Sequence, residues 1–181
     1  MTLEADLNNK DIDISVVSET HVKPGTPDAI VNVPGYNIFR RDRNWSGLNS
    51  RCKGGIAILA RGNLDLIHCY RSELYERHTG LASDFLQYLV HLADIALDQH
   101  PGLTSVSGGQ DTNQLDVNEL CQSTGWNSPV DFPTRGDAHL DNVLTNRPDL
   151  FGKCVPFSIS IKTDHTAVIL PAGSKLKPVR Q

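Results

Sequence analysis

The stretch Ile12-Asp13-Ile14-Ser15-Val16-Val17-Ser18 decides how the rest of the chain is interpreted. It is rich in β-branched residues and is bounded by polar and turn residues, which predicts a buried strand. The strand ends at Glu19-Thr20-His21, and Lys23-Pro24-Gly25 then turns the chain. We therefore expect this strand to deliver polar groups at its C-terminal end.

Further strands bounded by turn residues are predicted along the chain. After Pro34-Gly35, Tyr36–Arg40 alternates like an edge strand, and Gly54–Ala60 is an apolar run opened by glycines. Leu103–Ser107 predicts a short strand that breaks at Gly108-Gly109 into a polar loop. Further strands are expected at Leu140–Leu144, Ser158–Ile161 and Thr166–Leu170.

Helical periodicity separates these strands. From Ser83, a plausible N-cap, apolar residues follow the helical period as far as Leu97, and His100-Pro101-Gly102 ends the helix. A second, short helix is expected over Val117–Gln122. Strands mixed with helices predict an α/β protein, in which helices cover the apolar faces of sheets.

Composition limits the class of protein. With 181 residues, 39% apolar and 21% charged, we expect one globular domain over residues 1–170 and a basic C-terminal tail at 171–181. The net charge of −4 gives no general basic field, so any DNA contact must come from a local patch. Four scattered cysteines give little support for zinc and fit a reduced intracellular protein. No signal peptide or membrane span is expected.

The polar residues that follow the strands form a candidate site. Metal-assisted phosphodiester hydrolysis needs carboxylates for a hard cation, a base for water, and donors for the charge that develops on the phosphate. Because three polar clusters each follow a strand, we expect them to share one site. That site would contain Glu19, Asp111, Asn113, Asp141, Asp164 and His165.

An ordered series of motifs runs from Ile12 to Val168. Its members are Ser18-Glu19-Thr20, Gly35-Tyr36 with Arg40–Arg43, Gly54–Ile58, Gly108-Gly109 with Asp111–Asp116, Phe132–Gly136, Leu140–Asn146 and Lys162–His165. In this order they resemble the endonuclease/exonuclease/phosphatase superfamily, in the form of the endonuclease domain of long-interspersed-element-type retrotransposons. That domain is associated with reverse transcriptase and nicks DNA with the help of magnesium.

The resemblance implies a role for each residue of the site. Glu19 would bind Mg²⁺ or Mn²⁺, and Asp164 would lie near the metal. Asp111 would orient or deprotonate the attacking water, and Asn113 would hold the phosphate. His165 would hydrogen-bond the scissile phosphate. Its imidazole would be fixed by Asp141, since an Asp–His pair holds one tautomer and stabilises imidazolium.

The resemblance also implies the partner and the fold. The partner is DNA, contacted through its phosphate backbone by Arg40, Arg41, Arg43 and Arg135. The arginines at 40–43 are equally typical of a solvated loop. The implied fold is a four-layered α/β sandwich, and the implied location is nuclear, by analogy with other DNA-nicking domains. No membrane partner is expected, and the sequence leaves the oligomeric state open.

The chain departs from the family pattern in three places. It begins after the family's first strand, it lacks a central strand with a Tyr-Pro-Pro-like loop, and Gln110 is inserted into the Gly-Asp-x-Asn motif. We therefore expect an incomplete sandwich and a truncated or degenerate copy. Whether it is an enzyme stays open between an endonuclease and a non-catalytic remnant that acts at most as a binding domain. A phosphatase for small phosphate esters is a third, less favoured possibility.

Overall fold

In a computed structural model the chain forms helices and short strands that are mixed along the sequence. The structure describes residues 2–23, 25–42, 55–62, 82–104, 106–111, 116–161 and 163–173. Its contacts divide the chain into two compact units, Met1–Tyr70 with Ile159–Lys162, and Arg71–Ser158 with Thr163–Gln181. The protein is mixed α/β with small antiparallel sheets. The single domain over residues 1–170 stays a prediction.

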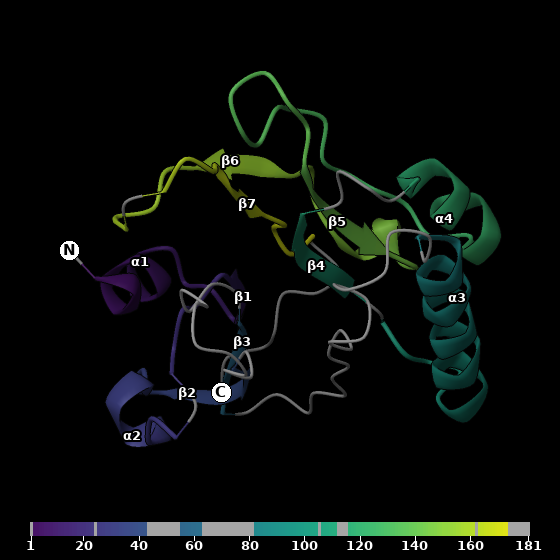
Figure 1. Ribbon diagram of the computed structural model, residues 1–181. Helices are drawn as coiled ribbons and strands as arrows, with labels where there is room; N and C mark the ends of the chain where they lie inside the picture. Colours follow the sequence, from purple (N-terminus) through teal and green to yellow (C-terminus); the bar gives the residue numbers. More distant parts are fainter. Residues whose placement is uncertain are drawn as a thin grey trace, which may run out of the picture. The chain divides into compact units, whose positions relative to one another are not determined.

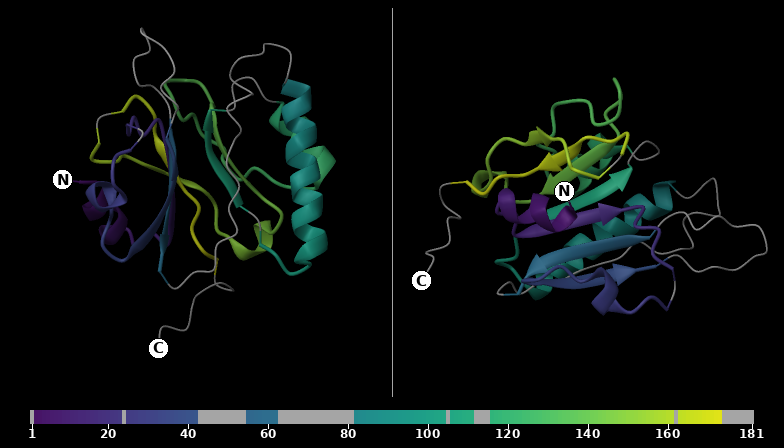
Figure 2. Two further views of the ribbon diagram at one scale, coloured as in Figure 1. Left: turned by 60° about the horizontal axis from the view of Figure 1, so that its bottom comes forward. Right: turned by 90° about the vertical axis from the view of Figure 1, so that its left-hand side faces the viewer.

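The first unit is built on a three-stranded antiparallel sheet in the order β1-β3-β2. Its strands are β1 (Ile14–Ser18), β2 (Tyr36–Arg41) and β3 (Ile56–Arg61), which lie side by side in the right-hand view of Figure 2. The edge position predicted for β2 is confirmed. The strand expected to be buried, β1, is instead the opposite edge and is only partly covered.

Two helices accompany this sheet, α1 (Leu3–Asn9) and α2 (Asp28–Val31). The sequence did not predict α1, because its apolar signal consists of only Leu3 and Leu7, one turn apart. Leu7 is nevertheless part of the core, together with Val33, Tyr36 and Leu59. The Thr2 side chain caps the helix by accepting a hydrogen bond from the backbone of the first turn.

The second unit contains two helices, α3 (Ala82–Gln99) and α4 (Val117–Thr124), which pack against each other (Figure 1). The short helix expected at Val117 is confirmed, with Asp116 as its N-cap and Gly125 in the left-handed conformation as its C-cap. Ser83 is not the N-cap of α3, because the helix already includes Ala82. No described helix has the length and apolar character needed to cross a membrane.

Two antiparallel pairs of strands complete this unit. One joins β4 (Val106–Asp111) to β5 (Asp141–Thr145), and the other joins β6 (Val155–Phe157) to β7 (Ala167–Ile169). A short 3₁₀ helix, η2 (Pro148–Leu150), follows β5. Leu120 of α4 and Leu144 of β5 form the buried centre of this unit, and Val90, Val117, Cys121 and Trp126 pack against it.

Two strand predictions are wrong, for identifiable reasons. Ser158–Ile161 is not a strand, because the backbone N–H of Ser160 donates to the side chain of Asp6 instead of to a ladder. The strand expected to break at Gly108-Gly109 runs on through both glycines to Asp111, because a bulge accommodates them.

We predict that Leu7→Ala lowers the free energy of unfolding by about 2–5 kcal/mol, because it opens a cavity among Val33, Tyr36 and Leu59. The matched control is Ile30→Ala, since Ile30 is 73% exposed and its loss should change stability by no more than about 0.5 kcal/mol. Urea unfolding of both variants measures the difference. Equal effects would show that α1 does not belong to the core.

Candidate functional site

An aspartate–histidine pair lies in the second unit. Asp141 opens β5, and His165 lies two residues before β7. His165 Nδ1 is 2.7 Å from Asp141 Oδ2, a hydrogen bond in which the ring N–H donates to the carboxylate. The side chain of His165 is only 29% exposed and that of Asp141 only 20%. With Nδ1 donating, Nε2 is the ring nitrogen left to interact with a ligand.

Thr134 fixes the backbone on both sides of this pair. It is fully buried, and its Oγ1 accepts hydrogen bonds from the backbone N–H groups of Leu140 at 3.1 Å and Asp141 at 2.9 Å. Its carbonyl accepts a third bond, at 2.6 Å, from the N–H of Thr166, the neighbour of His165. Thr134 lies within the motif Phe132–Gly136, but nothing in the sequence pattern assigned it this role.

An ion pair lies next to His165 in the chain. Arg135 Nη2 is 2.7 Å from Asp164 Oδ2, and both side chains are largely exposed. The pKa of Asp164 is lowered, first by a hydrogen bond from its own backbone N–H and then by the charge of Arg135. Arg135 therefore lies next to Asp164, the residue before His165, and the carboxylate of Asp164 balances its charge.

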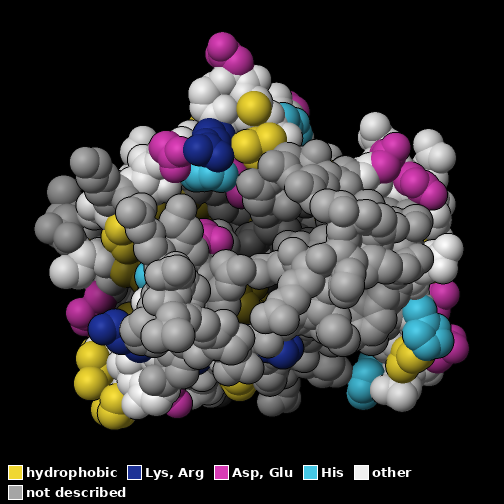
Figure 3. Space-filling model, in the orientation of Figure 1, with side chains coloured by type: hydrophobic (Ala, Val, Ile, Leu, Met, Phe, Trp, Pro, Cys, Tyr) yellow, Lys and Arg dark blue, Asp and Glu magenta, His cyan; other side chains and the backbone are white. Residues whose placement is uncertain are grey.

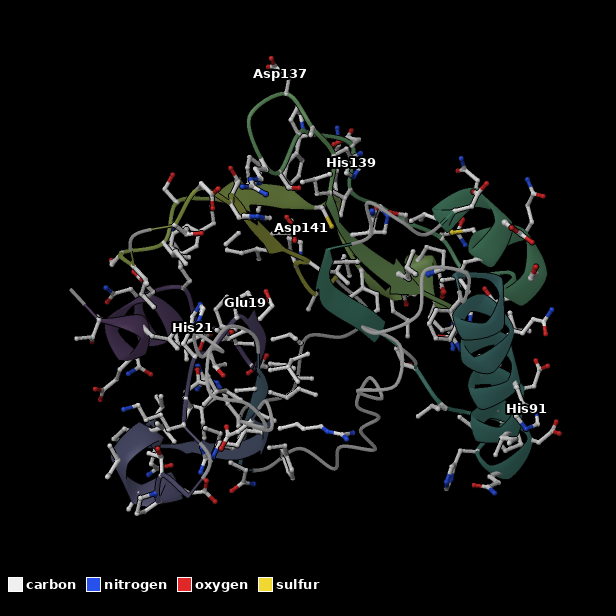
Figure 4. The ribbon with its side chains drawn as sticks, in the orientation of Figure 1. Glu19, His21, His91, Asp137, His139 and Asp141 are labelled. Atoms are coloured by element: carbon white, nitrogen blue, oxygen red, sulfur yellow. The ribbon has the colours of Figure 1, made fainter. Side chains whose placement is uncertain are left out.

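Three acidic and histidine residues of this unit lie on one loop and on the strand that follows it. In Figure 4, Asp137 stands at the tip of a loop, His139 lies on its flank and Asp141 lies at the start of the strand below. Figure 3, in the same orientation, shows basic, acidic and histidine side chains gathered beneath that tip. Gly136, at a φ of +56°, provides the left-handed residue that this loop requires.

Asp111 and Asn113 were expected beside this pair. Ser107 pairs with Leu144, but Gln110 pairs with Asn142, so β4 has one residue more than β5 across this interval. The extra residue forms a β-bulge, after which the Cα of Asp111 pairs with that of Asp141. The insertion is thus absorbed within the ladder, while Asn113 lies outside the described residues.

Glu19 belongs to the first unit and lies directly after β1. Its φ is +54° and that of His21 is +52°, a conformation that is uncommon for residues other than glycine. Figure 4 shows both side chains on the same turn, where His21 Nε2 lies 3.6 Å from Glu19 Oε2. Such strain typically costs about 1–3 kcal/mol for each residue and gathers at functional sites.

Gly55 makes this turn possible. At a φ of +93° it accepts a backbone hydrogen bond from the N–H of Thr20, and a Cβ at this position would lie 2.5 Å from Thr20 Oγ1. A larger residue at this position would clash with the Thr20 side chain and would be strained by the left-handed backbone. Gly55, which was expected only at the start of a strand, therefore also shapes the turn after β1.

Of the carboxylates in the candidate site, Glu19 is the one best able to bind magnesium. Mg²⁺ takes oxygen ligands, and Glu19, with a carboxylate that is 62% exposed, has the chemistry to supply one. Asp164 is already engaged by Arg135 and Asp141 by His165. Within the described residues, no three His, Cys, Asp or Glu side chains form a group that could hold a metal ion. Glu19 therefore fits the cation, and the described residues alone do not complete its ligands.

The arginines expected to contact DNA differ in their surroundings. The side chain of Arg40 is 14% exposed and forms ion pairs with Asp28 at 2.6 Å and Asp42 at 2.7 Å, besides a hydrogen bond to the carbonyl of Thr26. Its charge is therefore matched within its own unit. Arg41 is exposed at the end of β2, and Arg43 lies outside the described residues.

Neither described cysteine has the properties of a nucleophile. Burial raises the pKa of Cys154 to about 11, with a smaller contribution from the charge of Asp131. Burial also raises the pKa of Cys121. Because the thiolate is the reactive form, both side chains remain inert thiols at neutral pH. The chemistry of the described residues therefore centres on carboxylates and histidine.

We predict that Thr134→Val costs about 1–3 kcal/mol in stability for each of the two backbone N–H groups that lose their acceptor. Thr134→Ser keeps the oxygen and should cost only about 1 kcal/mol for the lost methyl group. Guanidinium unfolding of the two variants compares them. Equal losses would mean that Thr134 acts through packing alone.

Asp164 provides a prediction about pH. Since its folded-state pKa is lowered, the stability that it contributes is present above its unfolded pKa and is lost as the pH falls through the lower folded value. Arg135→Gln should raise the pKa of Asp164 only part of the way, because the bond from its own backbone remains. Carboxyl ¹³C NMR titration measures this shift. Lys153→Gln, which breaks a distant ion pair with Asp131, is the control and should leave it unchanged.

Comparison with known proteins does not place the chain in a family. No protein-family model matches the chain, and no curated protein is significantly similar to it. The resemblance drawn from the ordered motifs therefore stays a prediction.

Proposed function

We propose that this protein is a divalent-metal-dependent phosphodiester hydrolase that nicks DNA, of the retrotransposon endonuclease type. The observation that carries the proposal is the hydrogen bond between Asp141 and His165. It joins two residues from separate motifs, and the resemblance assigns these two to one catalytic pair. Arg135 and Asp164, from the same two motifs, also form a pair.

The chemistry follows from the properties of this pair. Asp141 accepts the hydrogen bond from Nδ1 and so holds the imidazole in one orientation. A ring that carries a proton on both nitrogens also donates from Nε2, and such a donor stabilises the charge that grows on a phosphate oxygen when water attacks phosphorus. Thr134 keeps the two partners in register by fixing the backbone at Asp141 and Thr166.

The other residues have supporting roles in the proposal. Glu19 would hold Mg²⁺ or Mn²⁺, which lowers the pKa of bound water and neutralises phosphate charge when it is present. The strained turn that presents Glu19 supports this assignment. Asp111 would orient the water, and its backbone pairing with Asp141 is compatible with that task. Asn113 would hold the phosphate, and Asp164 would lie near the cation.

The proposal extends to the fold and the partner. The small antiparallel sheets would be parts of a four-layered α/β sandwich. Arg41 and Arg135, both well exposed, are the described arginines best suited to contact DNA phosphates. Action on DNA would require a nuclear location.

A non-catalytic binding domain is the second candidate. It is motivated by Gln110, which is inserted into the Gly-Asp-x-Asn motif of the resembled family. Because loss of one positioned donor costs about 10²–10³ in rate, a site without several of its donors would have little activity left. The two candidates differ in whether purified, folded protein cleaves DNA.

We predict Mg²⁺-dependent nicking of supercoiled plasmid, abolished by a chelator. His165→Ala and Glu19→Ala should each lower the rate about 10²–10³-fold. Asp141→Asn should lower the rate too, because an amide in place of the carboxylate no longer holds the imidazole in the same tautomer and orientation. His91→Ala is the matched control, since His91 lies on the exposed side of α3, and it should be fully active. A folded wild-type protein that does not nick would favour the non-catalytic candidate instead.

A further inference from the structure

An exposed ion pair lies beside the Asp141–His165 pair in the second unit. Arg135 Nη2 is 2.7 Å from Asp164 Oδ2, and the side chain of Arg135 is 49% exposed and that of Asp164 68%. The pKa of Asp164 is lowered first by its own backbone N–H, then by Arg135 and by the charge of His165. Arg135 and His165 are therefore both close to this one carboxylate.

Backbone hydrogen bonds place Arg135 and Asp164 next to each other independently of their ion pair. Arg135 and Ala138 exchange two such bonds, of 3.0 and 2.9 Å, which close a tight turn. The carbonyl of Thr134, the residue before Arg135, accepts a bond of 2.6 Å from the N–H of Thr166. Because these bonds fix both segments, the ion pair can break by side-chain rotation alone.

The ion pair itself is a weak contact that another anion can replace. Exposed pairs contribute little net stability, because both charges are well solvated when they are apart. The guanidinium carries five N–H donors in a planar fork, which fits phosphate oxygens as well as carboxylate oxygens. A phosphate group can therefore compete with Asp164 for the side chain of Arg135.

We propose that Asp164 is an internal competitor for the phosphate group that Arg135 binds. In the free protein the carboxylate occupies the guanidinium, and a phosphate group binds by taking its place. The contact is thus autoinhibitory, because it lowers the affinity of Arg135 for phosphate. DNA as the source of the phosphate rests on the proposed function, whereas the exchange itself can be tested with inorganic phosphate.

Three variants separate this exchange from general repulsion between like charges. Asp164→Asn keeps the size of the side chain and removes its charge, Arg135→Gln removes the guanidinium, and the double variant removes both. Asp137→Asn is the matched control, because it removes the same charge from the exposed tip of the loop that carries Arg135 (Figure 4). All three positions are exposed, so the variants should fold.

Inorganic phosphate is the first probe, added to the full chain in the presence of a chelator. NMR follows the Arg135 Nε–H signal and the Asp164 carboxyl ¹³C signal. We expect phosphate to move both signals together, because the guanidinium leaves the carboxylate when it binds phosphate. In Asp164→Asn the Arg135 signal should reach half of its change at an about three- to fivefold lower phosphate concentration, the equivalent of an exposed ion pair.

A labelled DNA duplex tests the source of the phosphate. Fluorescence anisotropy, again with a chelator, measures its Kd without cleavage. Asp164→Asn should lower this Kd about three- to fivefold. Asp137→Asn should change it less than about 1.5-fold at about 0.15 M salt, because distant exposed charges are screened. In the Arg135→Gln background Asp164→Asn should have no larger effect than Asp137→Asn, because the carboxylate then has no guanidinium to occupy.

Three outcomes would overturn the proposal. Phosphate that moves the Arg135 signal but not the Asp164 signal would bind beside an intact ion pair. An Arg135 signal that does not move would mean that no phosphate binds there. An equal gain in DNA affinity from Asp164→Asn with and without Arg135 would show repulsion alone. If wild-type protein exchanges Asp164 for inorganic phosphate but neither binds nor nicks DNA, the proposed function fails and the exchange stands.

Discussion

The arrangement of the second unit depends on a single buried hydroxyl. Thr134 Oγ1 accepts two backbone hydrogen bonds at the point where β5 begins, and the carbonyl of the same residue accepts one from the segment before β7. Two segments that are distant in sequence are thereby aligned by one side chain and its own backbone. The Asp141–His165 bond follows from this alignment, because each partner adjoins a group that Thr134 holds.

The sequence predicted those helices and strands whose own residues are enough to determine them. Helix α4 has its cap at Asp116 and its terminating Gly125, β2 alternates between apolar and polar residues, and β3 is an apolar run. Predictions failed where a distant partner decides the outcome. Ser158–Ile161 has the composition of a strand, but the bonds of Ser160 to Asp6 take it out of any ladder, and no local rule contains Asp6.

The same division holds for the candidate site. Asp141 and His165 were identified from motif order, and the structure brings them within hydrogen-bonding distance. Thr134 was missed because a buried hydroxyl in a turn has no sequence signature, and its importance arises only from the two N–H groups that reach it. The charge balance around Arg40 was also invisible, since Asp28 is a neighbour only after folding. Glu19 was expected at a strand end, but its left-handed backbone was not.

The bulge in β4 decides which residues of this strand face β5 at its end. An extra residue in a regular ladder would rotate every following side chain to the opposite face. At Gly108-Gly109 the extra residue is confined to one irregular step, so regular pairing resumes at Gln110 and Asp111. The two glycines thus let β4 hold one additional residue while its last residue still stands opposite the first residue of β5.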